Sequence, residues 1–487
     1  MDARGVRWVV EAERLPALRR VAAALADPAV RPVQQIPSRA HFRLPPEAPG
    51  ARGVFVKHYR LLGWPRRLRH VVRPLPAAVE WEVARALARH GLAAIVPWAW
   101  GVRRRCGVPE ECYLVADDLG ELPTLEAWIP SCHRRLAGRT FRGALAALAR
   151  TLRRLHDLGY FHGDPHQRNI VPLEGPDGPR WAFLDFQQSR RARLTAPYRR
   201  LRDLGRVFHG VRLYLGRTER ARLLRAYLGP GARLPRRLFR LLEAVTLCYE
   251  FRLLRRRARR CLVPGEHFRK SRVGAITVWH VAAADAERIA ARLRNAAGGD
   301  ESLPAVRALG GGGKKAWMGA HALLARGLPT PRPLAWVKDE DQKAEYLVTE
   351  PNPGAVPLEA ALAAARDPAE KAKLLRAAGQ ALRRLHELGA WHCVGETCLV
   401  ALRGYSGEGG EWTVQFARPE HCRFRPWVGQ KLRRRDVARL AAALGRAAPG
   451  IPEGAWRAFL HAYLTPGGTA RGEAYWRLIR RFARSPD

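Results

Sequence analysis

The chain has 487 residues, a formal charge of +42 and a hydrophobic content of 47%. That length exceeds one ordinary core, so we expect two domains, and the hydrophobic content excludes a disordered chain. No apolar run is long enough to cross a bilayer and the first residues lack a signal-peptide core, so we expect a cytoplasmic protein. The eight cysteines are scattered without paired zinc-ligand spacing, which predicts reduced thiols.

The excess of basic residues, mostly arginine, has two explanations. A composition bias towards Arg, Ala, Gly and Pro would produce it without any functional consequence. Alternatively, the chain binds an anionic partner such as a phosphorylated glycolipid or a membrane surface. The sequence shows neither zinc-finger spacing nor an aromatic RNP-type strand, so we expect no nucleic-acid partner. Of the anionic partners, a membrane surface is favoured.

Residues 1–118 are expected to form a small, strand-rich lobe. The segment Val33–Leu44, a turn-rich stretch and then Val54–Tyr59 predict a hairpin followed by a further strand. Lys57 lies in an apolar run of that last strand, VFVK, in a chain where lysine is scarce. Residues 58–75 then mix arginines with Leu, Val and Trp64. This segment is either a solvated loop or an interfacial segment that binds a membrane surface.

A helix is predicted next, over Val79–Leu92. Glu80 begins it, and the following apolar residues keep helical spacing, so Glu80 can face the strand that carries Lys57. Glu82 is the alternative partner for that lysine. Two residues on a helix differ by about 200° around its axis, so the two glutamates cannot both face Lys57.

Residues 119–255 are expected to form a helical lobe containing a loop and one hairpin. Apolar residues at steps of four and three predict a helix over Phe141–Leu155, ended by Gly159. The loop Tyr160–Asn169, YFHGDPHQRN, comes next. Asn169–Leu173 and Trp181–Phe186 then predict two strands with a turn-rich stretch between them. Two carboxylates, Asp164 and Asp185, therefore fall at the ends of elements that flank one hairpin.

This set of side chains suits phosphoryl transfer to a hydroxyl group. Asp164 can accept the proton of the attacking hydroxyl, while Asn169 and Asp185 supply the hard oxygen ligands that Mg²⁺ requires. In such a site Lys57 contacts the α- and β-phosphates of ATP and pairs with Glu80. The competing explanations are a chance HxDxxxxN pattern and an ordinary exposed strand lysine, but the order of helix, loop and hairpin favours the functional one.

The second half of the chain repeats the first. LRRLHDLGYFH at 152–162 recurs as LRRLHELGAWH at 382–392, a shift of 382 − 152 = 230 residues. A period of that size indicates a duplicated domain rather than a solenoid. The expected fold class is therefore α+β, with two tandem protein-kinase-like domains at 1–255 and 256–487. Each would have a small β-rich N-lobe and a helical C-lobe.

The copy loses the catalytic chemistry. At the same shift, or aligned through the tryptophan that follows Glu80, the four functional positions become Val394 for Asp164, Leu399 for Asn169, Gln415 for Asp185 and Ala316 for Glu80. Without these carboxylates a site can neither hold two Mg²⁺ ions nor accept a proton. Glu396 and Cys398 could be considered replacements, but the apolar neighbours argue against them. The second half is therefore predicted to be a pseudokinase.

The first half resembles the lipopolysaccharide kinase family (Kdo/WaaP, InaA-like), kinase-fold enzymes that phosphorylate sugars of the lipopolysaccharide inner core. The resembling segments are VFVKHY at 54–59, VEWEVARALARHGL at 79–92, LHDLGYFHGDPHQRN at 155–169, WAFLDFQ at 181–187 and RDLGRV at 202–207. HGDxHxxN is shared with aminoglycoside- and choline-kinase-like enzymes. The Glu-Trp helix start and the RDL segment favour the lipopolysaccharide branch.

The resemblance implies a catalytic base at Asp164, metal ligands at Asn169 and Asp185, and a phosphate-contacting Lys57 paired with Glu80. It also places His166 near the γ-phosphate, the alternative being a histidine that caps the loop. Asp203 would begin a helix and support the catalytic loop through its backbone amides. The sequence contains no GxGxxG, so the phosphate loop would be Pro37–Phe42, with Ser38 as its anchor. Gln187 replaces the glycine of DFG, which argues against activation by a flipping segment.

From these features we expect an ATP- and Mg²⁺-dependent kinase that phosphorylates a sugar hydroxyl of the lipopolysaccharide inner core or a related anionic glycolipid. The expected location is the cytoplasm, peripherally at the inner face of the cytoplasmic membrane. One alternative is a kinase for an aminoglycoside, a choline-like molecule or a protein. The other is a non-catalytic scaffold at the membrane surface.

Overall fold

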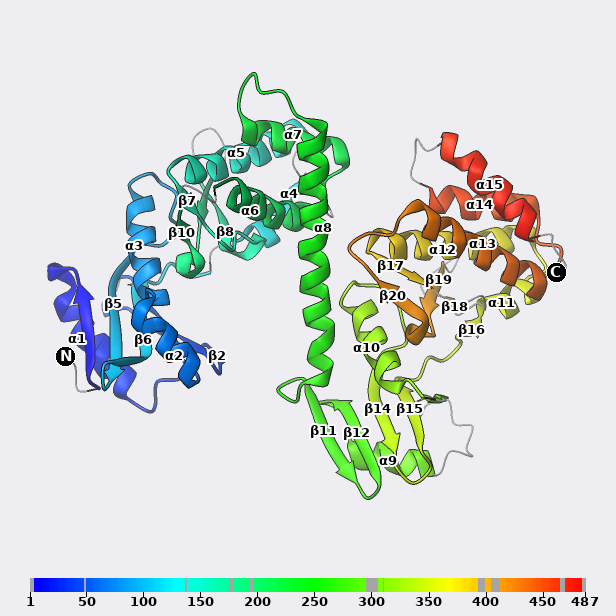
Figure 1. The fold of residues 1–487 in the computed structure, drawn as a ribbon, viewed down its shortest axis with the longest axis horizontal. Coiled ribbons are helices and arrows are strands. Elements are labelled where there is room, and N and C mark those ends of the chain that lie inside the picture. Colours follow the sequence, from blue (N-terminus) through cyan, green and yellow to red (C-terminus); the bar gives the residue numbers. More distant parts are fainter. Residues whose placement is uncertain are drawn as a thin grey trace. The chain divides into compact units, whose positions relative to one another are not determined.

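The computed structural model describes the chain except residues 1–3, 48–49, 122, 136–137, 175–178, 193–195, 213, 295–304, 310, 393–398, 404–410, 465–468 and 484–487. The chain divides into two compact units, residues 1–249 and 250–487. Each contains a sheet-bearing part followed by a helical part (Figure 1). The mixed helix and sheet content agrees with the predicted α+β class. The division lies inside helix α8 (Arg236–Arg259), slightly before the position expected from the sequence.

The first unit begins with a six-stranded antiparallel sheet of order β1-β5-β6-β4-β3-β2. Its elements are β1 (Val6–Val10), α1 (Leu15–Ala26), β2 (Gln34–Ile36), β3 (Arg39–Leu44), β4 (Val54–Arg60), α2 (Trp64–Val72), α3 (Pro76–Ala88), β5 (Pro97–Arg105) and β6 (Val108–Asp117). The hairpin and further strand predicted around Lys57 are confirmed as β2, β3 and β4. The arginine-rich segment forms helix α2 rather than a loop.

Alternation along β4 decides which residues face which helix. Val56 packs on one face of the sheet with Leu18 and Val21 of α1. Successive strand residues point to opposite faces, so Lys57 shares its face with Tyr59, which packs in the cluster containing Ala77 of α3. The sheet therefore directs Lys57 towards α3.

The helical part of the first unit has a core built around α5. Its elements are α4 (Leu125–Arg135), α5 (Gly138–Asp157), β7 (Tyr160–Phe161), η2 (Gln167–Asn169), β8 (Ile170–Leu173), β9 (Arg180–Phe183), η3 (Phe186–Gln188), β10 (Arg190–Arg191), α6 (Ala196–Val211), α7 (Arg217–Leu228) and α8. The predicted helix is confirmed by α5, whose periodic Phe and Leu residues are buried. The predicted hairpin is confirmed by the antiparallel pairing of β8 with β9.

Two predicted helix starts are wrong. Asp203 does not begin a helix, because α6 starts at Ala196 and encloses Asp203 in its buried middle. Glu80 lies in the second turn of α3, which starts at Pro76. Proline is well tolerated in the first turn of a helix, where its missing N–H would have no partner, so the helix extends back to that residue.

The second unit has a five-stranded sheet of order β11-β12-β14-β15-β13. This part comprises η4 (Arg260–Leu262), β11 (Phe268–Val273), β12 (Ile276–Val281), α9 (Ala286–Arg294), β13 (Ala305–Leu309), α10 (Gly313–Leu324), β14 (Pro333–Asp339) and β15 (Ala344–Thr349). The β12–β14 pairing with α9 following β12 repeats the β1–β5 pairing with α1 following β1. The sheet parts of the two units therefore share one plan.

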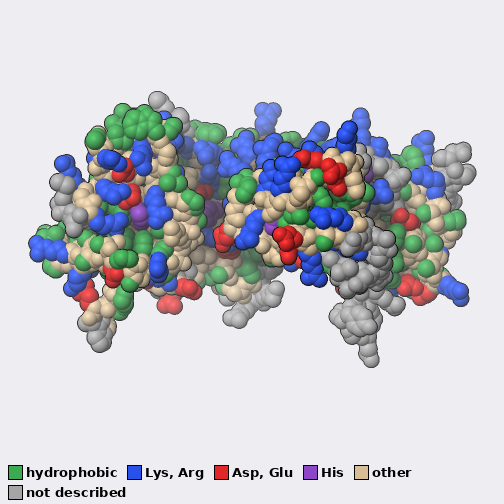
Figure 2. Space-filling view, turned by 90° about the horizontal axis from the view of Figure 1, so that it is seen from below, with side chains coloured by type: hydrophobic (Ala, Val, Ile, Leu, Met, Phe, Trp, Pro, Cys, Tyr) green, Lys and Arg blue, Asp and Glu red, His purple; other side chains and the backbone are tan. Residues whose placement is uncertain are grey.

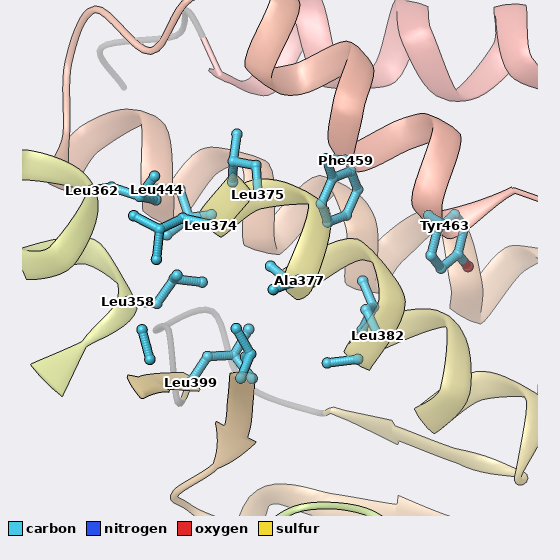
Figure 3. Close-up of a cluster of buried hydrophobic side chains, with 14 of the residues drawn as sticks. Leu358, Leu362, Leu374, Leu375, Ala377, Leu382, Leu399, Leu444, Phe459 and Tyr463 are labelled. Atoms are coloured by element: carbon cyan, nitrogen blue, oxygen red, sulfur yellow. The ribbon is translucent and has the colours of Figure 1, made fainter. Parts of the chain in front are cut away.

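The helical part of the second unit contains the largest apolar cluster that the described residues show. Its elements are β16 (Val356–Pro357), α11 (Leu358–Ala364), α12 (Pro368–Glu387), β17 (Ala390–His392), β18 (Leu399–Arg403), β19 (Trp412–Phe416), η5 (Pro419–His421), β20 (Cys422–Phe424), α13 (Gln430–Ala447), α14 (Glu453–Tyr463) and α15 (Thr469–Ala483). Leu374 and Leu382 of α12 pack here with Phe459 of α14 (Figure 3). No described helix is both long and apolar enough to cross a membrane.

A buried polar cluster holds the loop after α5 in the first unit. The Tyr227 hydroxyl lies 2.8 Å from His156 Nδ1, and His156 Nε2 lies 3.4 Å from Asp203 Oδ2. The same Asp203 oxygen accepts a 2.8 Å bond from the backbone N–H of His162. A neutral histidine with its proton on Nε2 satisfies both neighbours.

The second unit repeats this cluster residue for residue. His386 Nδ1 lies 2.8 Å from the Tyr463 hydroxyl, and its Nε2 lies 3.0 Å from Asp436 Oδ2. The His392 N–H donates to the same oxygen at 2.8 Å. Burial lowers the pKa of His386, against the opposing influence of Asp436. This match, together with the shared sheet plan, shows that the repeated sequence is a repeated fold.

We predict that Asp436→Ala destabilises the second unit by about 3 kcal/mol, because it leaves the His392 N–H and the His386 Nε2–H buried without an acceptor. Calorimetry should show one transition lowered by roughly 6–12 °C. Arg434→Ala removes an exposed side chain from the same helix and should leave Tm unchanged. Equal stability of the two variants would contradict the structural role given to Asp436.

Candidate active site

Three charged side chains meet where β4, α3 and the turn after β9 come together. Lys57 Nζ lies 2.6 Å from Glu80 Oε1 and 3.4 Å from Asp185 Oδ1. The Tyr59 hydroxyl donates to the other Glu80 oxygen at 2.9 Å. Glu82 is exposed, so α3 presents Glu80 to the lysine, as the helical spacing predicts. The structure thus brings together three of the residues predicted for this site.

The pKa values of these groups reflect burial set against charge pairing. Burial alone would lower the pKa of Lys57, but the Asp185 and Glu80 carboxylates outweigh it and raise that pKa. Burial raises the pKa of Glu80, and Lys57 opposes it. Burial would also raise the pKa of Asp185, yet Lys57 and Arg39 together lower it. Asp185 is therefore an anion at neutral pH, ready to bind a cation.

Asp185 has a backbone conformation that few non-glycine residues adopt. Its φ is 63° and its ψ 65°, in the left-handed region. The preceding residue, Leu184, is fixed on both sides: its N–H donates to the Asn169 carbonyl at 2.9 Å, and its carbonyl lies 2.9 Å from His162 Nε2. Strained backbone of this kind is concentrated at functional sites, where the surrounding structure maintains it.

The loop that carries Asp164 is held by its backbone. Asp203 accepts bonds from the N–H groups of His162 and Gly163, at 2.8 and 3.2 Å. Gly163 has a φ of 79°, and a Cβ there would lie 2.5 Å from the Gln188 carbonyl oxygen, so only glycine fits. Asn169 Nδ2 donates to the Asp164 carbonyl at 3.1 Å. Asp203 therefore acts on the loop amides, as the family resemblance implies.

The carboxylate of Asp164 has two neighbours that sequence reasoning missed. Gln188 Nε2 donates to its Oδ2 at 3.3 Å, and Arg206 Nη1 lies 3.6 Å from its Oδ1. Arg206 is mostly buried and its guanidinium also lies over the ring of Tyr249, at 5.4 Å. One of many arginines in the chain, it carries no sequence signal that would single it out.

Asn169 and Asp185 fit a Mg²⁺ site by the chemistry of their donor atoms. Asn169 commits its Nδ2 to the Asp164 carbonyl, which leaves the metal-binding oxygen outside that bond. Asp185 keeps an ionised carboxylate, and hard oxygens of this kind suit Mg²⁺, which usually retains several waters. Among the described residues, no group of three or more His, Cys, Asp or Glu forms a denser metal cluster.

Ser38 and His166 are placed less directly. Ser38 lies in the turn between β2 and β3, where its carbonyl accepts from the Arg60 N–H at 2.9 Å. The next residue, Arg39, reaches the site instead, 3.8 Å from Asp185. His166 caps η2, its Nδ1 accepting from the Arg168 N–H at 3.2 Å, which is the loop-capping role left open by the sequence. Neither has a described side-chain contact with Lys57 or Asp164.

The second unit has a different ion pair at the position of Lys57. Arg307 of β13 lies opposite Leu347 of β15, as Lys57 lies opposite Leu114. Both Arg307 Nη atoms bond to the Glu420 carboxylate of η5, one of them at 2.7 Å. Ala316 precedes Trp317 on α10, in the place that Glu80 has before Trp81 on α3.

Two counterparts proposed from the 230-residue shift are wrong. The Phe416 N–H donates to the Pro329 carbonyl at 2.9 Å, just as the Phe183 N–H donates to Leu92. The shift here is therefore 416 − 183 = 233 residues. Asp185 then corresponds to Arg418, not Gln415.

The pairing of β18 with β19 corrects the other counterpart. Leu399 lies opposite Phe416, as Ile170 lies opposite Phe183, so Leu399 matches Ile170 and not Asn169. Asn169 corresponds to Cys398. Cys398, Val394 and Glu396 lie outside the described residues.

Comparison with known proteins gives three matches. The model of the lipopolysaccharide kinase (Kdo/WaaP) family matches residues 50–227 and 315–463. The lipopolysaccharide core heptose(I) kinase WaaP of Pseudomonas aeruginosa is 26% identical over 187 residues, covering 36% of this chain and 69% of that protein. A solved structure titled WaaP in complex with acyl carrier protein aligns with a TM-score of 0.38 and 23% identity, over 50% of this chain and 95% of that one.

The family match has one segment in each unit. The first contains all the charged residues of the site except Arg39, and the second contains Glu420 and Arg418 but not Arg307. The two segments together span more than half of the chain. The chain therefore belongs to the lipopolysaccharide kinase (Kdo/WaaP) family.

Proposed function

We propose that the first unit transfers the γ-phosphoryl group of ATP to a sugar hydroxyl of the lipopolysaccharide inner core or a related anionic glycolipid. The observation that carries this proposal is the position of Lys57 Nζ between Glu80 and Asp185. A lysine paired with a helix glutamate, beside a metal-binding aspartate, is the arrangement that kinase-fold phosphoryl transfer uses. Family membership supports the class of acceptor.

In this mechanism the chain's residues orient two substrates. Lys57 contacts the α- and β-phosphates of ATP, while Mg²⁺ held by Asn169 and Asp185 neutralises phosphate charge. The sugar oxygen attacks the γ-phosphorus, the bond to the β-phosphate oxygen breaks, and the hydroxyl proton passes to the Asp164 carboxylate. Arg206, 3.6 Å from that carboxylate, helps to hold it ionised and oriented before the transfer.

Three further residues complete the proposed phosphate site. The turn containing Ser38 takes the place of a glycine-rich loop, and Arg39 extends from it towards Asp185. An arginine there adds a positive charge where the phosphates would bind. His166, two residues after Asp164, borders the γ-phosphate while its backbone and Nδ1 shape the loop.

The second unit is proposed to be a pseudokinase. Arg418 reverses the charge of the metal-binding Asp185, and the Arg307–Glu420 pair occupies the position of the catalytic lysine. A fixed cation at a metal position repels Mg²⁺ instead of binding it. The unit keeps the buried cluster that stabilises the fold, which suits a structural or binding role.

Helix α2 is the proposed contact with the inner face of the cytoplasmic membrane. It has no buried residue, and Trp64 and Val72 are 62% and 85% exposed. Arg67 fixes the helix to the sheet by donating to the Glu110 carboxylate and the Leu61 carbonyl. Figure 2 shows basic side chains spread over one whole face of the molecule, so charge alone does not single out a site. Exposed apolar residues among arginines do, because this combination suits an anionic lipid surface.

Asp164→Asn should lower γ-phosphate transfer to the lipopolysaccharide inner core by about 10²–10⁴-fold, since the hydroxyl proton loses its acceptor. Purified protein, radiolabelled ATP and separated acceptors would measure it. Glu82→Gln, an exposed change on α3, should retain full activity. Unchanged transfer by Asp164→Asn would remove the enzymatic proposal and favour a scaffold, whereas transfer only to an aminoglycoside, choline or a protein would reject the acceptor.

The double variant Trp64→Ser with Val72→Ser should reduce co-sedimentation with phosphatidylglycerol-containing vesicles at least about fivefold, because it removes the apolar anchors but not the arginines. Trp427→Ser, which removes a similarly exposed tryptophan from the second unit, is the matched control. A comparable loss in that control, or equal wild-type binding to neutral phosphatidylcholine vesicles, would count against α2 as the contact.

A further inference from the structure

The second unit contains a cavity that the proposed reaction does not use. Its volume is about 660 Å³, and it lies among the last turns of α8, helix α10 and strand β20. Small-molecule sites typically have volumes of about 300–1,000 Å³. The counterparts of the nucleotide-site residues, Arg307, Ala316 and Arg418, are not among its lining residues. The cavity is therefore distinct from the degenerate nucleotide site.

Much of the cavity wall is apolar. Phe251 and Ala258 of α8, Met318 and Ala322 of α10, and Phe424 of β20 contribute to it. Most of these side chains are buried or half-buried, so they form a wall rather than a surface patch. Apolar surface of this kind is stabilised by an apolar occupant.

The remaining wall is strongly basic. Six of the lining residues are cationic and none is acidic: Arg255, Arg259, Lys314, Lys315, Arg326 and Arg423. Within the described part of the chain, none of the six forms a salt bridge with a carboxylate. Positive charges left without carboxylate partners around one cavity favour an anionic ligand.

Arg326 makes the cavity a built site rather than a chance cluster of surface charges. It is 7% exposed, and its Nε and Nη1 donate to the Leu388 and Ala322 carbonyls at 3.1 and 2.9 Å. Its guanidinium lies over the ring of Phe424, at 4.4 Å. Burial lowers its pKa to about 10, and nearby Glu250 opposes that shift, so the group stays cationic at neutral pH.

We infer that this cavity binds an anionic amphiphile, with a phosphate-like head on the basic wall and an acyl-like chain along the apolar wall. Glu250 offsets one of the six positive charges, which leaves a clear excess for a head group of one or two negative charges. A phosphate without a chain would leave the apolar wall wet, and a neutral chain would leave the cations unpaired. The inference concerns binding alone and does not depend on the proposed phosphoryl transfer.

Calorimetric titration of the full chain tests it with three probes below their micelle-forming concentrations: dodecyl phosphate, dodecyl maltoside and inorganic phosphate. Dodecyl phosphate should bind with one site per chain, and the other two probes at least about tenfold more weakly. Equal binding of the neutral maltoside, or of inorganic phosphate, would overturn the inference, as would the absence of any binding. Asp164→Asn should bind dodecyl phosphate normally, which separates this result from a failure of the enzymatic proposal.

Two variant pairs locate the site. Lys314→Glu with Lys315→Glu should weaken dodecyl phosphate binding at least tenfold, whereas Arg256→Glu with Arg257→Glu makes the same charge change on exposed positions of α8 outside the cavity and should not. Met318→Glu should abolish binding and Met318→Leu should preserve it. Equal loss in both charge-reversal variants, with melting curves unchanged, would mean that the overall charge and not the cavity binds the probe.

Discussion

The buried charge of Lys57 is the constraint on which the rest of the active site depends. A cation removed from water is tolerated only when opposite charges surround it, so β4, α3 and the turn after β9 must bring Glu80 and Asp185 to the same point. That requirement fixes the register of β4 and the face that α3 presents. It also favours the left-handed backbone of Asp185, which is held from behind by the loop that carries Asp164.

The two units separate what the fold needs from what the chemistry needs. Both retain a histidine between a tyrosine hydroxyl and a buried aspartate that accepts from the loop backbone. Both retain a basic residue of the sheet paired with a carboxylate from the other part of the unit. In the second unit that pair is Arg307 with Glu420, which joins sheet and helical part without a metal ligand. An ion pair can therefore survive as a structural link after the catalytic residues change.

Local patterns predicted the parts of the site that depend on local geometry. Helical spacing distinguished Glu80 from Glu82, and the alternation around Lys57 placed it on an inward-facing strand. The positions of Arg39 and Arg206 depend on tertiary packing, and neither can be singled out among so many arginines. The error at Gln415 arose because a short identical stretch fixes the register only nearby. The connection between β18 and β19 is longer than that between β8 and β9, so the shift grows from 230 to 233 residues.

The exchange of Asp185 for Arg418 has a consequence for the second unit's ligands. An active kinase site presents carboxylates and relies on bound metal to make phosphates attractive, whereas a site with fixed guanidinium groups attracts anions directly. A duplicate that gives up metal binding is therefore free to accumulate positive charge, and the basic wall of the α8–α10 cavity extends the same trend. Because the two units share one chain, an anionic amphiphile held by the second would be kept at high effective concentration near the first, provided the geometry allows both to engage it.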